Sequence, residues 1–529
     1  MPEKKKREGF IYGAVILSLS GVLAKIIGIF FKIPLTNMVG AANMSHFTSA
    51  FEVYNFMLSV ATSGLPVGIS AMISSSLAVG KQRDIKTLMR SVTVIFISVG
   101  ALLAVLGMIF SSYIAKWMNS PDTVYCVRAI VPAIFFMAVV SVFRGFFQGY
   151  NNMTPTAVSN VIESVIKLGA GIAIAYYLKY VVGAPDPVVV SGGILGITLS
   201  TVISMIYLIL RYVFRSKSYR LSISEFKQDT LTPRSVLLKR FFNITVPIVL
   251  SSVTVHLMGL IDVACVIQIL KTYMGLEQAQ LLWGAYSSMA LTIFNLPSFV
   301  IISIGVSLVP SISGAFAKKD SPRIKYNFDT ALKFSSIIAF ACAFGLSAIS
   351  KGAIGLFFSG DGVEEASRLL EVISFALVAV GLTNITSYIL QAIGKATLSI
   401  ISIIVGTIIK TLTTVALILF PQINIFGAPI ATNIAYPVML ILNFVFIYKN
   451  LHLLPSAKDV FIKPLLAGIG CYASAKLFTF VFEMFMPQKI ALFFVILTAG
   501  IVYIALIFLL KLVTINEIKQ VFKKNKKNS

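Results

Sequence analysis

The sequence predicts an all-α polytopic membrane protein, because its composition, its long apolar runs and the placement of its basic residues agree. Hydrophobic residues make up 57% of the 529-residue chain and charged residues only 12%, about half the charged fraction of a soluble domain. Apolar runs recur from residue 9 to residue 511. They are too long for barrel strands of about 9–11 residues, so we expect helices, about fourteen in number.

Each span is placed where about 20 largely apolar residues follow one another. The predicted spans are 9–38, 45–79, 91–113, 127–149, 155–180, 188–213, 240–270, 283–316, 328–350, 368–393, 396–420, 425–448, 461–485 and 488–511.

The basic residues give an independent test, because cytoplasmic loops are enriched in Lys and Arg. If the N-terminus is inside, the basic clusters all fall on the inner side. These clusters are Lys4 to Arg7, the loops 80–90, 211–240 and 318–325, Lys395, the segment Lys449 to Lys463, and the tail from Lys511. The outer loops carry scattered single residues, Lys116, Arg128, Lys179, Lys271, Lys351, Arg368 and Lys489. Both termini are therefore predicted to be cytoplasmic.

The longest basic loop divides the chain. We expect an N-terminal six-helix lobe at 1–214, a basic cytoplasmic linker with an amphipathic helix at 215–239, and a second six-helix lobe at 240–450. Two further helices occupy 451–511, and a basic tail occupies 512–529. A weak repeat relates the lobes at one constant offset: Gln148, Thr154 and Lys167 correspond to Gln391, Thr397 and Lys410. Such parallel repeats are typical of transporters.

The charge and the motifs exclude several functions. The net charge of +24 lies in short loops, which indicates membrane topology and contact with anionic lipids and argues against nucleic-acid binding. The four cysteines are solitary, without metal-site or disulfide spacing. The chain lacks the phosphate-loop, zinc-protease and nucleophile-elbow motifs. We therefore expect no enzyme, no bound metal and no cofactor.

Four stretches resemble the multidrug/oligosaccharidyl-lipid/polysaccharide (MOP) exporter superfamily. They are Gly21–Gly28 with Pro34 and Gly40, Ser63–Pro66 with Ile69 and Ser70, Phe143–Gly149 with Met153–Ser159, and Val161–Glu163 with Lys167. The resemblance is closest to the polysaccharide transporter branch, which includes stage V sporulation protein B and the MurJ-type lipid II flippases of Gram-positive bacteria.

The resemblance implies a function. It implies two lobes that work by alternating access as a flippase or exporter in the cytoplasmic membrane. The cargo is a polyprenyl-pyrophosphate-linked saccharide, such as a lipid II-like precursor of the cell wall or of a polysaccharide. Gram-negative lipid II flippases carry several arginines on the first two helices. Here these helices carry Lys25, Lys32 and Glu52, so the cargo stays open, as does a vegetative or a sporulation role. We expect a monomer.

Charged residues within the spans are the candidate functional residues, because a charge at bilayer depth costs at least ~2.5–3.5 kcal/mol and normally faces a partner or a water-filled cavity. The candidates for cargo binding are Lys25, Lys32, Arg144, Gln148 and Lys167. Three of them have an ordinary alternative: Lys32 can extend to the outer interface, Arg144 can hold the turn that follows it, and Lys167 can pair with Glu163 four residues before it.

The candidates for gating or ion coupling are Glu52, Glu163, Asp262, Lys410 and Asn433. In the superfamily an acid on the seventh span can belong to a sodium site. We expect Lys410 to replace the cation and pair with Asp262, while Thr432 and Asn433 leave a Na⁺ site near Asp262 open. Coupling to Na⁺ or to H⁺ therefore stays open. His256 is either a proton carrier or a hydrogen-bonded structural residue.

The alternative function is a multidrug/cation antiporter of the same superfamily. That function favours acids facing the cavity, whereas basic residues outnumber acids within these spans.

Overall fold

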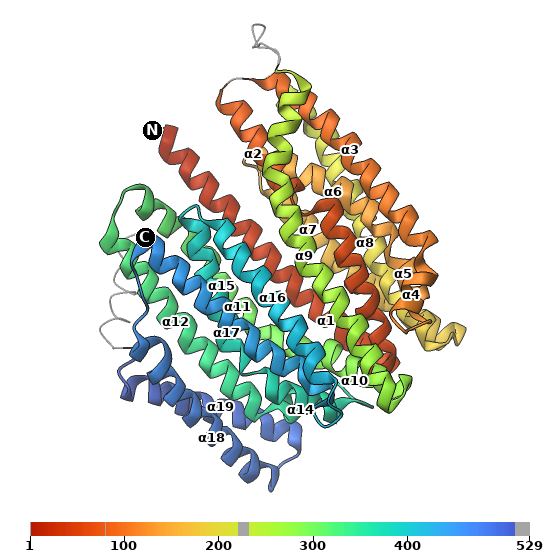
Figure 1. Cartoon of the computed structure of the whole chain (residues 1–529), viewed down its shortest axis with the longest axis vertical. Coiled ribbons are helices and arrows are strands. Elements are labelled where there is room, and N and C mark those ends of the chain that lie inside the picture. The colour runs from red at the N-terminus through yellow and green to blue at the C-terminus, as the bar shows by residue number, and fades with distance from the viewer. Residues whose placement is uncertain (1, 80, 221–231, 514–529) are drawn as a thin grey trace. The chain divides into compact units, whose positions relative to one another are not determined.

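The computed structural model describes residues 2–79, 81–220 and 232–513, and in these ranges the chain is almost entirely helical and contains no strand (Figure 1). Residues 221–231 of the predicted linker at 215–239, and most of the basic tail at 512–529, lie outside the described residues, while 215–220 and 234–239 belong to long helices. The chain divides into two compact units, Met1–Ser288 and Met289–Ser529.

The first unit consists of helices that follow one another through short turns. They are α1 (Pro2–Thr62), α2 (Leu65–Ala78), α3 (Gln82–Ile109), α4 (Ser111–Trp117), α5 (Thr123–Ile130), α6 (Pro132–Gly149), α7 (Thr154–Tyr176), η1 (Tyr177–Val182), α8 (Asp186–Arg220), α9 (Arg234–Met274) and α10 (Leu276–Gly284). Helix η2 (Ala285–Ala290) contains the boundary between the units.

Helix α1 is two crossings joined at Gly40. The backbone there is not helical (φ 78°, ψ 167°), a conformation that glycine adopts without strain. Along a straight helix Phe31 and Phe47 would be roughly 24 Å apart, yet their ring centroids lie 5.9 Å apart. The chain therefore folds back at Gly40, as the two predicted spans at 9–38 and 45–79 require.

The helix count agrees with the prediction. The described residues contain 12 helices long and apolar enough to cross a membrane, or 13 if one bent pair counts as a span. The first of these, Leu19–Leu77, is 59 residues long and is the folded-back segment, which supplies two crossings. The prediction of about fourteen membrane helices is thus confirmed.

Hydrogen bonds at each end of the first unit connect loops that the charge pattern predicts on the same side of the membrane. The Thr232 backbone N–H donates to Asp84 Oδ1 at 3.0 Å, and Lys81 Nζ donates to Thr232 Oγ1 at 3.4 Å. Elsewhere in the unit, Gln280 Nε2 donates to Ser120 Oγ at 3.1 Å. Loops predicted on the same side thus lie together, while the assignment of one side to the cytoplasm remains a prediction.

Helix α9 packs within the first unit, although the sequence analysis places residues 240–270 in the second lobe. Ser63 Oγ donates to Ser252 Oγ at 2.9 Å. A Cβ added at Gly64 would lie 2.7 Å from the Thr245 carbonyl oxygen, so α2 begins in direct contact with the α9 backbone. The predicted division into six, six and two helices remains a prediction based on the repeat.

The second unit contains the remaining helices. They are α11 (Leu291–Ala317), α12 (Ser321–Ala348), α13 (Ser350–Phe357), α14 (Val363–Ile373), α15 (Ala376–Ala392), α16 (Ala396–Ile418), η3 (Asn424–Phe426), α17 (Gly427–Leu451), η4 (Lys458–Ile462), α18 (Lys463–Glu483) and α19 (Gln488–Leu509).

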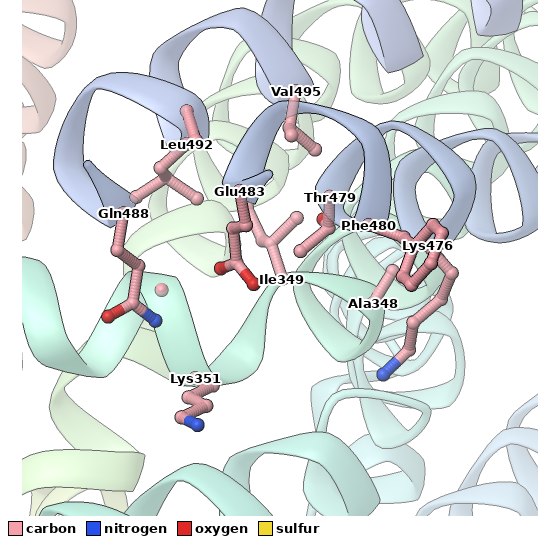
Figure 2. A pocket seen from close by; sticks show the side chains of 12 residues that line it. Ala348, Ile349, Lys351, Lys476, Thr479, Phe480, Glu483, Gln488, Leu492 and Val495 are labelled. Carbon is pink, nitrogen blue, oxygen red and sulfur yellow. The ribbon is translucent and has the colours of Figure 1, made fainter. Parts of the chain in front are cut away.

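Two features of the second unit bear on function. The predicted span 368–393 is broken, because α14 and α15 meet at a bend of 54°. Helices α18 and α19 pack on α12, where Tyr503 Oη donates to the Ile337 carbonyl oxygen at 2.6 Å. A pocket of about 270 Å³ opens where the end of α12 and the start of α13 meet α18 and α19 (Figure 2).

Helices α7 and α8 approach each other at backbone distance through Gly171 and Gly196. A Cβ at Gly171 would lie 2.8 Å from the Gly193 carbonyl oxygen, and one at Gly196 would collide with the Gly171 backbone. Small residues at such crossings allow the close packing that holds membrane helices together.

We predict that Gly196→Ala destabilises the protein by roughly 1–3 kcal/mol, because the added methyl group forces α7 and α8 apart. Gly169→Ala is the matched control on α7, since a Cβ there would have nothing within 4 Å. Thermal unfolding of both variants in detergent measures the difference, and equal melting temperatures would contradict the proposed close packing.

Candidate functional site

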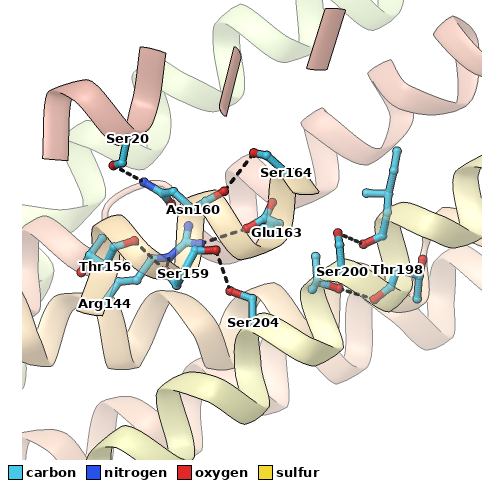
Figure 3. Close-up of polar contacts among 12 residues, drawn as sticks. Ser20, Arg144, Thr156, Ser159, Asn160, Glu163, Ser164, Thr198, Ser200 and Ser204 are labelled. Carbon is cyan, nitrogen blue, oxygen red and sulfur yellow. Dashed lines mark hydrogen bonds and ion pairs between the residues drawn. The ribbon is translucent and has the colours of Figure 1, made fainter. Parts of the chain in front are cut away.

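Arg144 and Glu163 form an ion pair inside the first unit. Arg144 Nη2 lies 2.9 Å from Glu163 Oε2, and Arg144 Nε donates to Ser159 Oγ at 3.0 Å (Figure 3). Helices α6 and α7 are joined by a short turn, so they run side by side, and Ser159 and Glu163 share the face of α7 toward α6 because they are four residues apart. The two charged side chains are only 14% and 27% exposed.

Hydrogen bonds connect this ion pair to two further helices. Ser204 Oγ of α8 donates to the Ser159 carbonyl oxygen at 3.2 Å. Asn160 Nδ2 donates to Ser20 Oγ of α1 at 3.5 Å. Figure 3 shows that these contacts join α1, α6, α7 and α8 into one polar network. Three successive helices and the distant α1 are thus held by side chains that sequence spacing alone does not relate.

Glu163 therefore has a partner that the sequence analysis did not assign to it. The i, i+4 spacing suggested Lys167, which does lie within electrostatic reach of Glu163, and the guanidinium of Arg144 binds the carboxylate directly. The Lys167 ammonium also lies near α1, where a Cβ at Gly28 would be 3.6 Å from its Nζ. Gln148 lies one turn beyond Arg144 and is half-buried. The proposed roles of all four side chains in cargo binding or gating remain predictions.

Lys32, Glu52 and Lys167 form a second charged group next to this network. Lys32 lies within electrostatic reach of both Glu52 and Lys167, and its Nζ is 5.9 Å from the centroid of the Phe47 ring. The fold-back of α1 at Gly40 brings Lys32 and Phe47 together. A Cβ at Gly259 of α9 would lie 3.1 Å from Glu52 Oε2, so the carboxylate lies against the α9 backbone. Lys25, two turns before Lys32, is exposed.

The structure adds two residues that sequence reasoning missed. Tyr54 is buried and lies within electrostatic reach of Arg144 and Glu163. His46 is 3% exposed, and its Nδ1 lies 2.8 Å from Ser120 Oγ and 3.1 Å from Thr123 Oγ1. The sequence offered no motif for either residue. The sequence analysis had considered His256 as a titratable histidine, and it is half-buried on α9.

The remaining candidates lie on elements of both units. Asp262 is buried on α9 of the first unit, whereas Lys410 is half-buried on α16 of the second. Their pairing remains a prediction. Asn433 Nδ2 donates to the carbonyl oxygens of Val372 and Pro429, both at 3.0 Å. Since Val372 is in the last turn of α14, Asn433 supports the backbone where that broken span bends.

These features define a class of protein: a multi-pass cell-membrane protein. Its first unit holds the Arg144–Glu163 ion pair between helices, with Lys32 and Lys167 beside it. Residues 10–316 match the model of the family described as "Polysaccharide biosynthesis protein". The match covers more than half of the chain, so the chain belongs to this family.

Relatives and solved structures agree with this membership. The chain is 24% identical to stage V sporulation protein B of Bacillus subtilis (strain 168), covering 80% of this chain and 81% of the relative. It is 21% identical to lipid II flippase MurJ of the same organism, covering 83% and 82%.

A solved structure of lipid II flippase MurJ in an inward closed conformation superimposes with a TM-score of 0.70 at 16% identity, covering 93% of this chain and 98% of that one. An inward-facing MATE transporter gives a TM-score of 0.66 at 15% identity, covering 83% and 98%. The fold is thus that of the MOP superfamily.

We predict that removing one partner of the Arg144–Glu163 pair destabilises the protein more than removing both. A lone charge left in a poorly solvated site costs up to about 3–5 kcal/mol, and partial exposure of Glu163 reduces this cost. Thermal unfolding of Arg144→Gln, Glu163→Gln and the double variant gives the coupling energy.

The exposed pair Arg368–Glu364, with side chains 68% and 72% exposed, is the matched control. It should give a coupling of about 0.2–1 kcal/mol. A coupling no larger for Arg144 and Glu163 would show that their pair does not hold α6 to α7.

Proposed function

We propose that this protein is a flippase or exporter that moves polyprenyl-pyrophosphate-linked saccharides, such as lipid II, across the cytoplasmic membrane by alternating access. It performs transport and no covalent chemistry. The observation that carries the proposal is the group of lysines in the first unit, Lys25 and Lys32 on α1 and Lys167 on α7. The names of two relatives, lipid II flippase MurJ and stage V sporulation protein B, and the description of the family support it.

The charge balance of this group favours an anionic cargo. Arg144 pairs with Glu163. Lys32 lies within electrostatic reach of Glu52 and Lys167, and Lys167 also lies within reach of Glu163. These three basic groups outnumber the two acids. Positive charges gathered at membrane depth repel one another and are costly to desolvate. A pyrophosphate offsets that cost, and a lysine ammonium binds phosphate as a flexible point charge. The same excess of positive charge repels the organic cations that a multidrug/cation antiporter carries.

Glu52 has a defined part in this proposal. It lies against the backbone of α9 and within reach of Lys32, so it occupies the lysines electrostatically when cargo is absent. A pyrophosphate that binds Lys32 and Lys167 competes with Glu52 for them. Cargo binding thereby changes the charge next to α9, which connects recognition of the cargo to a movement of the helices.

We predict that Lys32→Gln and Lys167→Gln each slow the flipping of labelled lipid II in liposomes by roughly tenfold or more, because each removes a charge-assisted contact of about 1.5–3 kcal/mol. Lys86→Gln, at an exposed position of α3, is the control and should flip at the wild-type rate. Flipping by both variants at the wild-type rate would refute the lysine site.

The same liposomes decide between cargo classes. Wild-type protein that flips another polyprenyl-linked saccharide and not lipid II would keep the class and change the cargo. Uptake of organic cations without any flipping would instead establish the antiporter.

We further infer that an ion gradient drives transport, with Na⁺ or H⁺ as the coupling ion. We predict that flipping depends on one of these gradients. Replacing Na⁺ by K⁺ at constant pH abolishes it in the first case, and collapsing the pH gradient abolishes it in the second. Flipping that is indifferent to both changes would exclude coupling to either ion.

A further inference from the structure

The pocket of the second unit has the two-part lining of a site for an amphiphile. Lys351, Lys476, Glu483 and Gln488 bring charged and polar groups to it, and the apolar part includes Leu492. Figure 2 shows the Glu483 carboxylate, the Lys351 ammonium and the Gln488 amide around one open space. Ligand pockets are commonly about 300–1,000 Å³, so a volume of about 270 Å³ suits the headgroup of a lipid and not a whole lipid.

The charges at this pocket balance one another. Lys476 Nζ lies 3.4 Å from Glu371 Oε1 of α14 and 5.6 Å from the centroid of the Tyr472 ring, so its position is fixed from two sides. Together with Lys351 and Glu483, the local charge sums to zero. A site of zero net charge with lysines apart from a carboxylate suits a ligand that carries one positive and one negative charge. A purely anionic headgroup would leave the Glu483 carboxylate facing a like charge.

The pocket also lies where lipid headgroups are. It is formed by the end of α12, the end of α18 and the beginning of α19, and the charge pattern predicts these ends on the outer side of the membrane. Lys476 and Glu483 are seven residues apart, about 10 Å along α18, which exceeds the roughly 5–7.5 Å of one interfacial layer. The apolar lining then faces the level of the acyl chains.

We propose that this pocket binds the headgroup of a zwitterionic phospholipid of the outer leaflet. Lys351 and Lys476 bind its phosphate, Glu483 binds its ammonium group, and its acyl chains lie along Phe480, which lines the pocket and is exposed. This site is on α12, α13, α18 and α19 and uses none of the residues proposed for cargo binding, so it stands independently of the cargo. It gives the last two helices a binding function at the outer surface.

Native mass spectrometry of the purified full-length protein tests the proposal. Phosphatidylethanolamine or phosphatidylglycerol of the same acyl composition is added. We expect adducts of phosphatidylethanolamine to survive at activation energies that remove phosphatidylglycerol. Glu483→Gln and Lys351→Gln should weaken phosphatidylethanolamine binding by roughly tenfold, as expected for loss of a charge-assisted contact.

Lys489→Gln is the matched control, because Lys489 is an exposed neighbour of Gln488 that does not line the pocket. It should bind phosphatidylethanolamine like the wild type. Equal retention of both lipids by the wild type, or equal losses in Lys489→Gln and Glu483→Gln, would overturn the proposal. A competition experiment tests whether the acyl chains contribute to binding, because glycerophosphoethanolamine has the same headgroup and no acyl chains. If it displaces phosphatidylethanolamine at equal concentration, the apolar lining contributes nothing and the lipid assignment is overturned.

Discussion

Keeping charged side chains inside a medium that solvates them poorly is the constraint on which the first unit depends. The structure meets it in two ways. The Arg144–Glu163 pair, supported by Ser159, neutralises one acid and one base and joins α6 to α7. Lys32 lies within electrostatic reach of Glu52, and Lys167 within reach of Glu163. The neutral pair holds the frame of the first unit, and in the proposed function an anionic cargo offsets the remaining positive charge.

Much of this architecture could be predicted from the sequence, because membrane spans follow from local hydropathy and from basic loops. The helix count and the grouping of the loops at the ends of the first unit depend on little else. The break between α14 and α15 was not foreseen, since neither glycine nor proline lies at the bend. Its support comes from Asn433 on α17, a contact between residues far apart in the chain. Long-range contacts of this kind leave no periodic pattern in a single sequence.

The candidate site shows the same limit at the level of individual side chains. The sequence identified the charged residues, but not their pairing. Spacing along a helix suggested Lys167 for Glu163, and the hairpin of α6 and α7 adds Arg144, which binds the carboxylate directly. Tyr54 and His46 could not have been selected, because buried phenol and imidazole groups in apolar segments are commonly structural. The pocket at the end of α18 could not be predicted for a further reason: its lining comes from three segments, and only two of them are neighbours in the chain.

The crossing of α7 and α8 has a consequence for how the first unit can move. At Gly171 and Gly196 no side chain separates the two backbones, so no rotamer change there can let one helix slide past the other. We therefore expect the two helices to move together as one rigid element. Glu163 and Lys167 both lie on that element, while Arg144 and Lys32 lie on neighbouring helices. A rotation of the element would shift Glu163 relative to Arg144 and Lys167 relative to Lys32 at the same time.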